Sequence, residues 1–162
     1  MKNTMKYSVV FFAMLLLGAC SNDENEIVPD FLDGTEYGVL LDVNVTSAIE
    51  VPETDLDNYA LNFEVVVKGD KSSVASIMVN KTFVNGGDGE ATTVSQETLS
   101  EFPQTLNLTA ENLVEGFSGL SVADLTATDS FNIGFVITYT DGRVVDRFDT
   151  SMRTNFTVLI TE

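Results

Sequence analysis

Residues 130–139 read SFNIGFVITY, and the pattern of this stretch indicates the class of fold. Large apolar side chains recur at every second position, namely Phe131, Ile133, Phe135, Ile137 and Tyr139. Successive side chains of a β-strand point to opposite faces. The period of two therefore predicts a strand with one face in a core and the other in water.

The same period recurs on both sides of this stretch. One row comprises Val39, Leu41, Val43 and Val45, and another comprises Tyr59, Leu61, Phe63, Val65 and Val67. Shorter strand candidates are residues 74–83, 92–96, 105–108, 144–148 and 156–160. Eight strands separated by turns predict an all-β fold, an antiparallel β-sandwich of seven to eight strands. We expect no α-helix longer than about two turns.

Asp141-Gly142 predicts a two-residue type I′ hairpin, whose central residues both need positive φ. That loop pairs Thr140 with Arg143 and therefore sets Ile137 opposite Asp146, which places a carboxylate on the core side. A buried carboxylate without a partner is costly. Two interpretations stay open. Either a β-bulge or an edge position lets Asp146 reach water, or Asp146 is an inward charge that pairs with Arg, Lys or a cation.

Residues 110–129 lack the period of two. Their apolar residues, Leu113, Phe117, Leu120, Val122 and Leu125, lie in a polar background. We expect this segment to cross between the sheets with a helical turn or two and to cover one end of the core. The Asn-Gly-Gly-Asp-Gly run at 85–89 predicts a longer loop.

Composition excludes several classes of function. The 162 residues carry a formal charge of -17 with no His, no Trp and one Cys. Nucleic acid is excluded as a partner, because phosphate neutralisation needs clustered Lys and Arg. The absence of His removes the usual general base of an enzyme. A glycosidase also needs aromatic residues that stack on sugars in its cleft, and most aromatic residues here fall on positions that face the core. We therefore expect a non-enzyme with one core domain.

The N-terminus has the features of an export signal. Two lysines in residues 1–6 precede nine apolar residues, Val9 to Leu17, a run too short to span a membrane. Leu17, Gly18, Ala19 and Cys20 follow, and this motif resembles the lipobox of bacterial lipoprotein signal peptides. The resemblance implies a cleaved signal peptide at 1–19 and a covalent lipid (diacylglycerol plus an acyl chain such as palmitate) on Cys20. Several acyl chains anchor a protein stably to a membrane.

The residues after Cys20 form a short acidic tether. Ser21 is followed by Asp23, Glu24 and Glu26, a pattern that resembles the export signal of Bacteroidota-type surface lipoproteins. The resemblance implies an outer-membrane protein with its lipid anchor in the outer leaflet and its domain exposed at the cell surface. Residues 20–34 are then the lipidated N-terminus and flexible tether, and residues 35–162 are the sandwich.

Two loops offer oxygen ligands for a metal. Asp55 and Asp57 lie within residues 53–58, and Asp88 and Glu90 form a second set. The EF-hand pattern is absent, so the favoured interpretation is solvated loops with no metal site. The alternative is weak calcium association near anionic lipid headgroups. No other cofactor is expected beyond the lipid on Cys20.

Aromatic residues are the usual platform for sugars. Tyr37, Tyr59 and Tyr139 are in phase with the core rows, so we interpret them as packing residues. Phe83, Phe102 and Phe117 lie near loops and are the other candidates.

The lipobox, the acidic tether and the strand-turn sequence TYTDGRVV at 138–145 together resemble a known group. They are similar to small surface lipoproteins of Sus-type glycan-uptake loci, some of which carry immunoglobulin-like domains related to the SusE N-terminal module. The resemblance implies an immunoglobulin-like sandwich that serves as an accessory binder or spacer in carbohydrate or nutrient uptake. Its partners would be a glycan or an outer-membrane transporter complex. The alternative is a structural or adhesive component that docks a protein partner through an edge strand.

Overall fold

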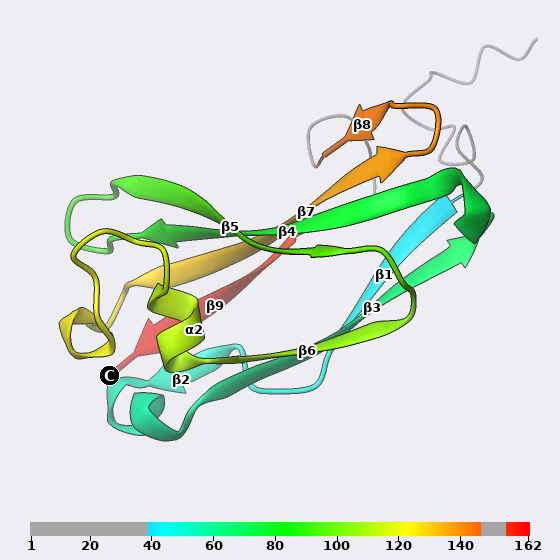
Figure 1. The fold of residues 1–162 in the computed structure, drawn as a ribbon. Helices are drawn as coiled ribbons and strands as arrows, with labels where there is room; N and C mark the ends of the chain where they lie inside the picture. Colours follow the sequence, from blue (N-terminus) through cyan, green and yellow to red (C-terminus); the bar gives the residue numbers. More distant parts are fainter. Residues whose placement is uncertain (1–38, 147–154) are drawn as a thin grey trace, which may run out of the picture. The chain divides into compact units, whose positions relative to one another are not determined.

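The computed structural model describes residues 39–146 and 155–162. These residues belong to one compact unit, in which two β-sheets pack face to face (Figure 1). All predictions that concern the signal peptide at 1–19, the tether at 20–34 or their residues lie outside the described residues.

The smaller sheet has three antiparallel strands in the order β1-β3-β6. They are β1 (Val39–Val45), β3 (Ala60–Gly69) and β6 (Gln104–Thr109). The first two rows predicted from the sequence form β1 and β3, apart from Tyr59, which directly precedes β3. Because β3 lies between two partners, its inward side chains Leu61, Phe63, Val65 and Val67 are fully buried.

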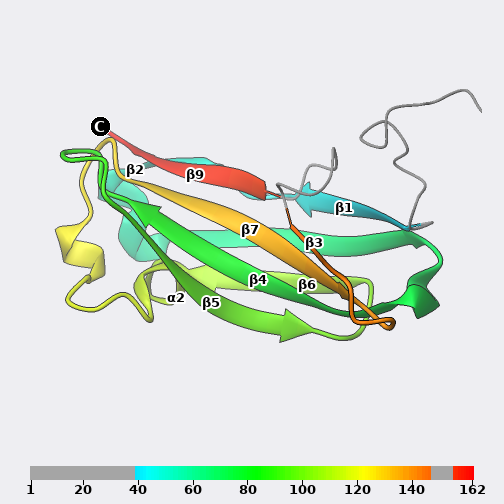
Figure 2. The same cartoon turned by 90° about the horizontal axis from the view of Figure 1, so that it is seen from above.

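The larger sheet has six strands, five of them in the order β2-β9-β7-β4-β5 (Figure 2). The sixth, β8, pairs with the end of β7 (Figure 1). The longer members are β4 (Val74–Val84), β5 (Ala91–Leu99), β7 (Ser130–Tyr139) and β9 (Asn155–Thr161). The shorter ones are β2 (Glu50–Pro52), which runs parallel to β9, and β8 (Val144–Val145). The sequence pattern did not predict β2, which contributes a single buried side chain, Val51.

One apolar core joins the two sheets. Phe63 of the smaller sheet meets Phe135 and Phe156 of the larger sheet edge-on, with ring centroids 6.0 and 5.4 Å apart. The row from Phe131 to Tyr139 is buried throughout, so the predicted all-β sandwich is confirmed. Burial of large aromatic and aliphatic side chains is the main favourable term in folding such a sandwich.

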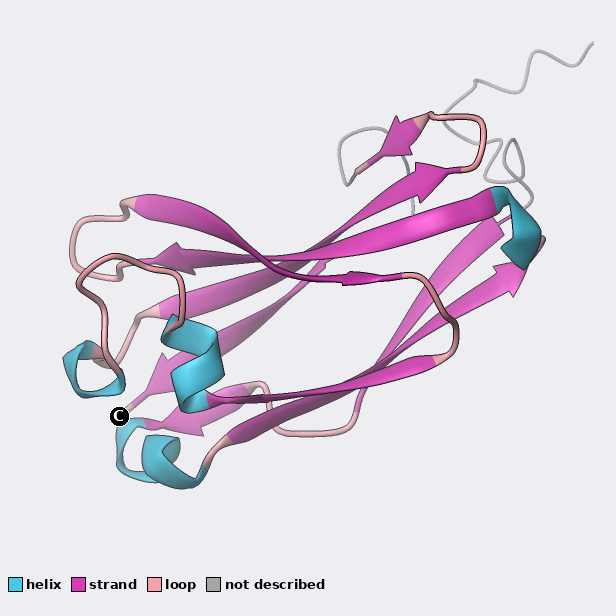
Figure 3. Ribbon diagram, viewed as in Figure 1, coloured by secondary structure: helices cyan, strands magenta, loops and turns pink. Residues whose placement is uncertain are grey.

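Helices are short and lie at the turns (Figure 3). They are η2 (Glu53–Asn58), η3 (Lys71–Ser73), α2 (Ala110–Val114) and η4 (Val122–Asp124). The segment 110–129 crosses from β6 in one sheet to β7 in the other, as predicted, and it buries Leu113, Phe117 and Leu125. Thr109 caps α2, because its hydroxyl accepts the backbone N–H of Asn112.

The hairpin loop between β7 and β8 is one residue longer than the two-residue loop predicted from the sequence. Tyr139 pairs with Arg143 across a three-residue loop, and Gly142 alone takes positive φ, at 88°. Three-residue loops of this kind end in a left-handed residue, a conformation that glycine adopts without steric cost. The register therefore sets Val145 opposite Ile137, and Val145 is buried. Asp146 does not face Ile137, so the predicted conflict disappears.

Candidate functional site

A cleft opens at one end of the sandwich, between the loop that joins β4 to β5 and the segment that follows α2. Its volume is about 310 Å³. The lining residues are Phe83, Asn85, Asp88, Glu90, Thr92, Phe117, Ser118, Gly119 and Leu120. The cleft therefore brings together two phenylalanines and two carboxylates that the sequence had offered as separate candidates.

Aromatic packing forms one wall of this cleft. The ring centroid of Phe83 lies 6.0 Å from that of Phe117 and 5.2 Å from that of Phe131. Phe131 is part of the core, whereas Phe83 remains partly exposed. Phe117 is 8% exposed, so little of its ring surface is accessible to a ligand in the cleft. The wall is thus rigid and offers limited apolar area to a ligand.

A buried lysine lies beneath the aromatic wall. Lys81 is 1% exposed, and its Nζ donates to the carbonyl oxygens of Asn112 and Glu115 at the end of α2. The Nζ also lies 5.7 Å from the ring centroid of Phe117. Burial lowers the pKa of Lys81, and the negative charge of Glu115 acts in the opposite direction. A cation at the C-terminal end of a helix bonds carbonyls that have no partner within the helix.

Sequence reasoning missed Lys81, although a signal was present. Lys81 occupies the same face of β4 as Ile77 and Val79, so the period of two already placed it in the core. A lysine in core phase indicates a buried acceptor nearby, because a buried ammonium group without partners is costly.

The carboxylate of Asp129 links the two loops at this end of the sandwich, the β4–β5 loop and the segment that precedes β7. Asp129 is 4% exposed, and its carboxylate accepts the backbone N–H groups of Gly86 and Thr126, each at 2.8 Å. The hydroxyl of Thr126 also donates to it, at 3.1 Å. Gly86 lies so close to Thr128 that a Cβ atom there would come within 2.6 Å of the Thr128 backbone. The two loops that shape this end are therefore held in one arrangement.

The carboxylates of the cleft are exposed and partly used by their own loop. Asp88 accepts the backbone N–H of Glu90 at 2.9 Å, and the Asn85 side chain accepts that of Gly87 at 2.7 Å. Acceptor oxygens beside aromatic carbon are chemically suited to a ligand with hydroxyl donors and apolar C–H edges.

The other metal candidates lie elsewhere. Asp55 and Asp57 are exposed on η2 and are separate from the cleft. Within residues 39–146 and 155–162, no group of three or more Asp, Glu, His or Cys residues is arranged to hold a metal ion.

The aromatic candidates outside the cleft are mostly packing residues. Tyr139 is 2% exposed in the core, and Phe102 is partly buried against it. The Tyr59 hydroxyl donates to the carbonyl oxygen of Ala48 at 2.8 Å, so this tyrosine packs with a bonded hydroxyl. Burial raises the pKa of Tyr59, and a hydrogen bond with Ser47 partly opposes that shift. Tyr37 lies outside the described residues.

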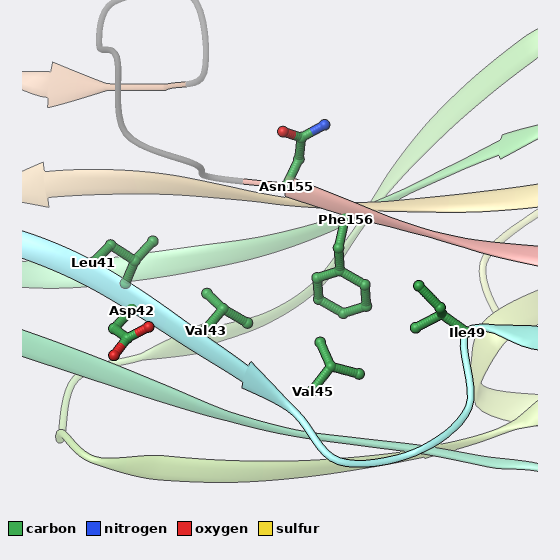
Figure 4. A pocket seen from close by; sticks show the side chains of 7 residues that line it. All are labelled: Leu41, Asp42, Val43, Val45, Ile49, Asn155 and Phe156. Carbon is green, nitrogen blue, oxygen red and sulfur yellow. The ribbon is translucent and has the colours of Figure 1, made fainter.

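A second hollow lies along the side of the sandwich, where β1 faces β9 (Figure 4). It has a volume of about 370 Å³ and is lined by Leu41, Asp42, Val43, Val45, Ile49, Asn155 and Phe156. The Phe156 ring extends from β9 toward Val45, and Asn155 points away (Figure 4). We call this hollow the side groove.

No protein-family model matches the sequence, and no curated protein matches it. Among solved structures, the chain is similar to a beta-glucosidase from Listeria innocua in complex with gluconolactone, with 14% identity and a TM-score of 0.41. The complex of that enzyme with glucose gives 13% identity and a TM-score of 0.39. Both alignments cover 76% of this chain and only 16% of the enzyme chain.

Among residues 39–146 and 155–162, no helix is long and apolar enough to cross a membrane.

Proposed function

We propose that this protein is a non-catalytic lipoprotein of the outer membrane, anchored through Cys20 and exposed at the cell surface. The observation that carries the proposal is the position of the only cysteine, directly after Leu17-Gly18-Ala19 and a signal-type apolar run. A β-sandwich that begins within twenty residues of that cysteine supports it, since such a domain needs a tether to leave the membrane.

We further infer that the sandwich is immunoglobulin-like. The first two long strands, β1 and β3, share one sheet, β4 and β5 lie in the other, β6 returns to the first, and β7 and β9 lie in the second. This chain order matches strands A and B, C and C′, E, and F and G of an immunoglobulin-type Greek key. The first part of the domain contributes to both sheets. Its strand β1 pairs with β3 in the smaller sheet, and the short strand β2 that follows pairs with β9 in the larger sheet.

The cleft at the end of the sandwich supports an accessory role in carbohydrate capture. Its acceptors, Asp88, Glu90 and Asn85, suit the hydroxyl donors of a neutral sugar, and Phe83 offers a partly exposed apolar edge. A formal charge of -17 disfavours anionic glycans. In this proposal the module is an accessory protein of an uptake complex. It either binds a neutral glycan weakly and passes it to the complex, or acts as a spacer beside it.

Retention of cells on neutral polysaccharides tests the glycan role. Cells that display the full chain should be retained, and Glu90→Gln should reduce retention because an amide replaces a double acceptor at the cleft rim. Glu97→Gln on β5 is the matched control, since Glu97 is also exposed and lies outside the cleft. Equal retention by both variants, or no retention of the parent chain, would remove glycan capture from the proposal.

Protease accessibility on intact cells tests the surface location. Replacement of Asp23, Glu24 and Glu26 by alanine should leave the protein lipidated but protect it from protease added outside the cells. If the protein remains as accessible as before, the acidic tether is not an export signal.

The side groove favours a second candidate function, the docking of an extended strand from a protein partner. Directly after the last ladder pair, Val45 and Phe63, Thr46 donates its N–H to the carbonyl oxygen of Asn62, so the backbone groups of this position point toward β3. The alternation of an antiparallel ladder then directs the backbone groups of Val43 and Val45 toward the edge of β1 that pairs with no other described strand. Val45→Pro should abolish capture of a partner strand while leaving the β1–β3 hydrogen bonds in place. Unchanged capture would exclude this edge.

A further inference from the structure

The outer face of the six-stranded sheet carries no charge on its four long strands. Side chains alternate with the buried row, so the register identifies eighteen outward positions. They are Ser76, Met78, Asn80, Thr82 and Val84 on β4; Ala91, Thr93, Ser95 and Thr98 on β5; Ser130, Asn132, Gly134, Val136 and Thr138 on β7; and Asn155, Thr157, Leu159 and Thr161 on β9. We call this surface the neutral face.

The absence of charge on this face is unusual for this chain. Charged residues make up 20% of the sequence, so about four of eighteen surface positions would carry a charge at that frequency. The outer face of the smaller sheet does carry charges, at Asp42, Glu64 and Lys68. On the outer face of the larger sheet, Glu50 is charged on the edge strand β2, and Asp146 directly follows β8, where the β7–β8 register continues toward Val136. Glu97 lies on the edge strand β5 opposite the inward residue Val79. A neutral centre with a charged rim is typical of protein interfaces.

The centre of the neutral face is apolar and shallow. Met78 and Val136 are cross-strand partners, and Gly134 follows on the same strand face. A Cβ atom on Gly134 would meet nothing within 4 Å, and its φ is not positive, so the fold itself does not require glycine there. Glycine within a strand weakens the strand and often marks a place where another backbone approaches closely. Leu159 on this face is 39% exposed.

We propose that the neutral face binds a second copy of this chain across a twofold axis. Two molecules that each carry a charge of -17 repel each other, and the eighteen outward positions of the four long strands bring no carboxylate of their own into such a contact. Serine, threonine and asparagine side chains both donate and accept hydrogen bonds. The face is therefore complementary to itself, which a twofold interface requires.

The size of the face sets the strength of this association. Four strands spaced about 4.8 Å apart and about nine residues long at 3.3 Å each present roughly 600 Å². A standard interface buries about 800 Å² from each partner. The face therefore lies at the small end of that range, and we expect a weak and reversible dimer. This inference does not depend on lipid anchoring or on glycan capture.

A matched pair of variants tests the dimer. Val136→Glu places a carboxylate near the centre of the neutral face, and Val66→Glu makes the same change on the outer face of β3 in the smaller sheet. Sedimentation equilibrium of the full chain in a mild detergent should show a dimer for the parent chain and for Val66→Glu. The dimer association constant should fall at least about tenfold for Val136→Glu, because like charges would face each other across the axis.

A second pair protects the test against misfolding. Thr157→Glu on β9 and Thr105→Glu on β6 both alter exposed threonines, and circular dichroism confirms that each variant is folded. Only Thr157→Glu should weaken the dimer. The proposal would be overturned if the parent chain were monomeric at every concentration. It would also be overturned if the two variants of each pair had the same dimer association constant. If a monomeric parent chain instead binds neutral polysaccharide in a Val136-dependent way, the face is a glycan platform and the proposed dimer is wrong.

Discussion

At the end of the sandwich that holds the cleft, Lys81 and Asp129 are buried and bond to main-chain atoms of neighbouring loops. At the opposite end, around η3 and the β7–β8 hairpin, charged side chains meet at the surface. Lys68 lies 2.5 Å from Asp42, and Arg143 lies 2.7 Å from Asp141, with all four side chains at least 36% exposed. We call these regions the cleft end and the hairpin end.

The difference shows where polar side chains determine structure in this fold. A surface ion pair gains little, because water and salt screen both charges. A buried charge is costly unless its hydrogen bonds are made, so Lys81 and Asp129 hold their loops in the single arrangement that provides those bonds. The cleft is therefore preorganised, which reduces the entropic cost of binding a ligand there.

The largest effect is expected from Asp129→Ala. This change removes three hydrogen bonds to a buried carboxylate and leaves the N–H groups of Gly86 and Thr126 without their acceptor. We expect a loss of about 3–4 kcal/mol in the free energy of unfolding, measured by urea denaturation. A loss below about 1 kcal/mol would mean that the loops do not depend on this carboxylate.

Gly86→Ala should follow in size. The added methyl group would press on the carbonyl of Thr128, which is backbone and has little freedom to move aside. Such overpacking costs about 1–3 kcal/mol. Gly134→Ala is the matched control, since its Cβ enters open space. The two variants should differ clearly in thermal unfolding, and similar melting temperatures would contradict the close loop contact.

Lys81→Met should cost about 1–2 kcal/mol at neutral pH, because the carbonyls of Asn112 and Glu115 lose their donor while a buried charge is also removed. The pKa of Lys81 is lowered in the folded state, so above that pKa the unfolded chain binds more protons than the folded one. The stability of the parent chain relative to the variant should therefore rise as pH increases from the lowered value toward about 10.4, the ordinary pKa of lysine.

Tyr59 does not confuse this comparison. The pKa of Tyr59 is raised, so it destabilises the folded state at alkaline pH, but it does so equally in the parent chain and in the variant. Denaturation curves of both proteins across the alkaline range give the difference directly. A difference that is flat with pH would show that Lys81 is not desolvated.

The smallest effect is expected at the hairpin end. Lys68→Ala breaks the exposed pair with Asp42 and should change the free energy of unfolding by less than about 1 kcal/mol, and by less still at high salt. Urea denaturation at two salt concentrations measures this. A loss comparable with that of Asp129→Ala would remove the distinction between the two ends.

The long strands could be predicted from the sequence because each buries one face of a sheet. The rows in β1, β3 and β7 follow a period of two without interruption, so alternation alone located them. The three-residue β2 is too short for a period to show. The predicted hairpin register was wrong because Asp-Gly fits both a two-residue and a three-residue loop. The loop length depends on whether Val144 or Val145 packs in the core, which the local sequence does not determine.

The candidate site could be predicted only in part. Phe83, Phe117, Asp88 and Glu90 were all named from the sequence, but their meeting in one cleft depends on how the crossing segment packs on β4. The neutral face could not be anticipated, because it needs the register of four strands that are distant in the sequence. Tertiary pairing, rather than local pattern, creates both surfaces.

The central claim is that Cys20 carries the lipid that anchors this domain, and metabolic labelling with a clickable fatty acid tests it most directly. The full chain, expressed in a lipoprotein-processing bacterium, should incorporate the label and remain in the membrane fraction, and Cys20→Ala should do neither. Label on the Cys20→Ala variant, or a parent chain without label, would contradict the account.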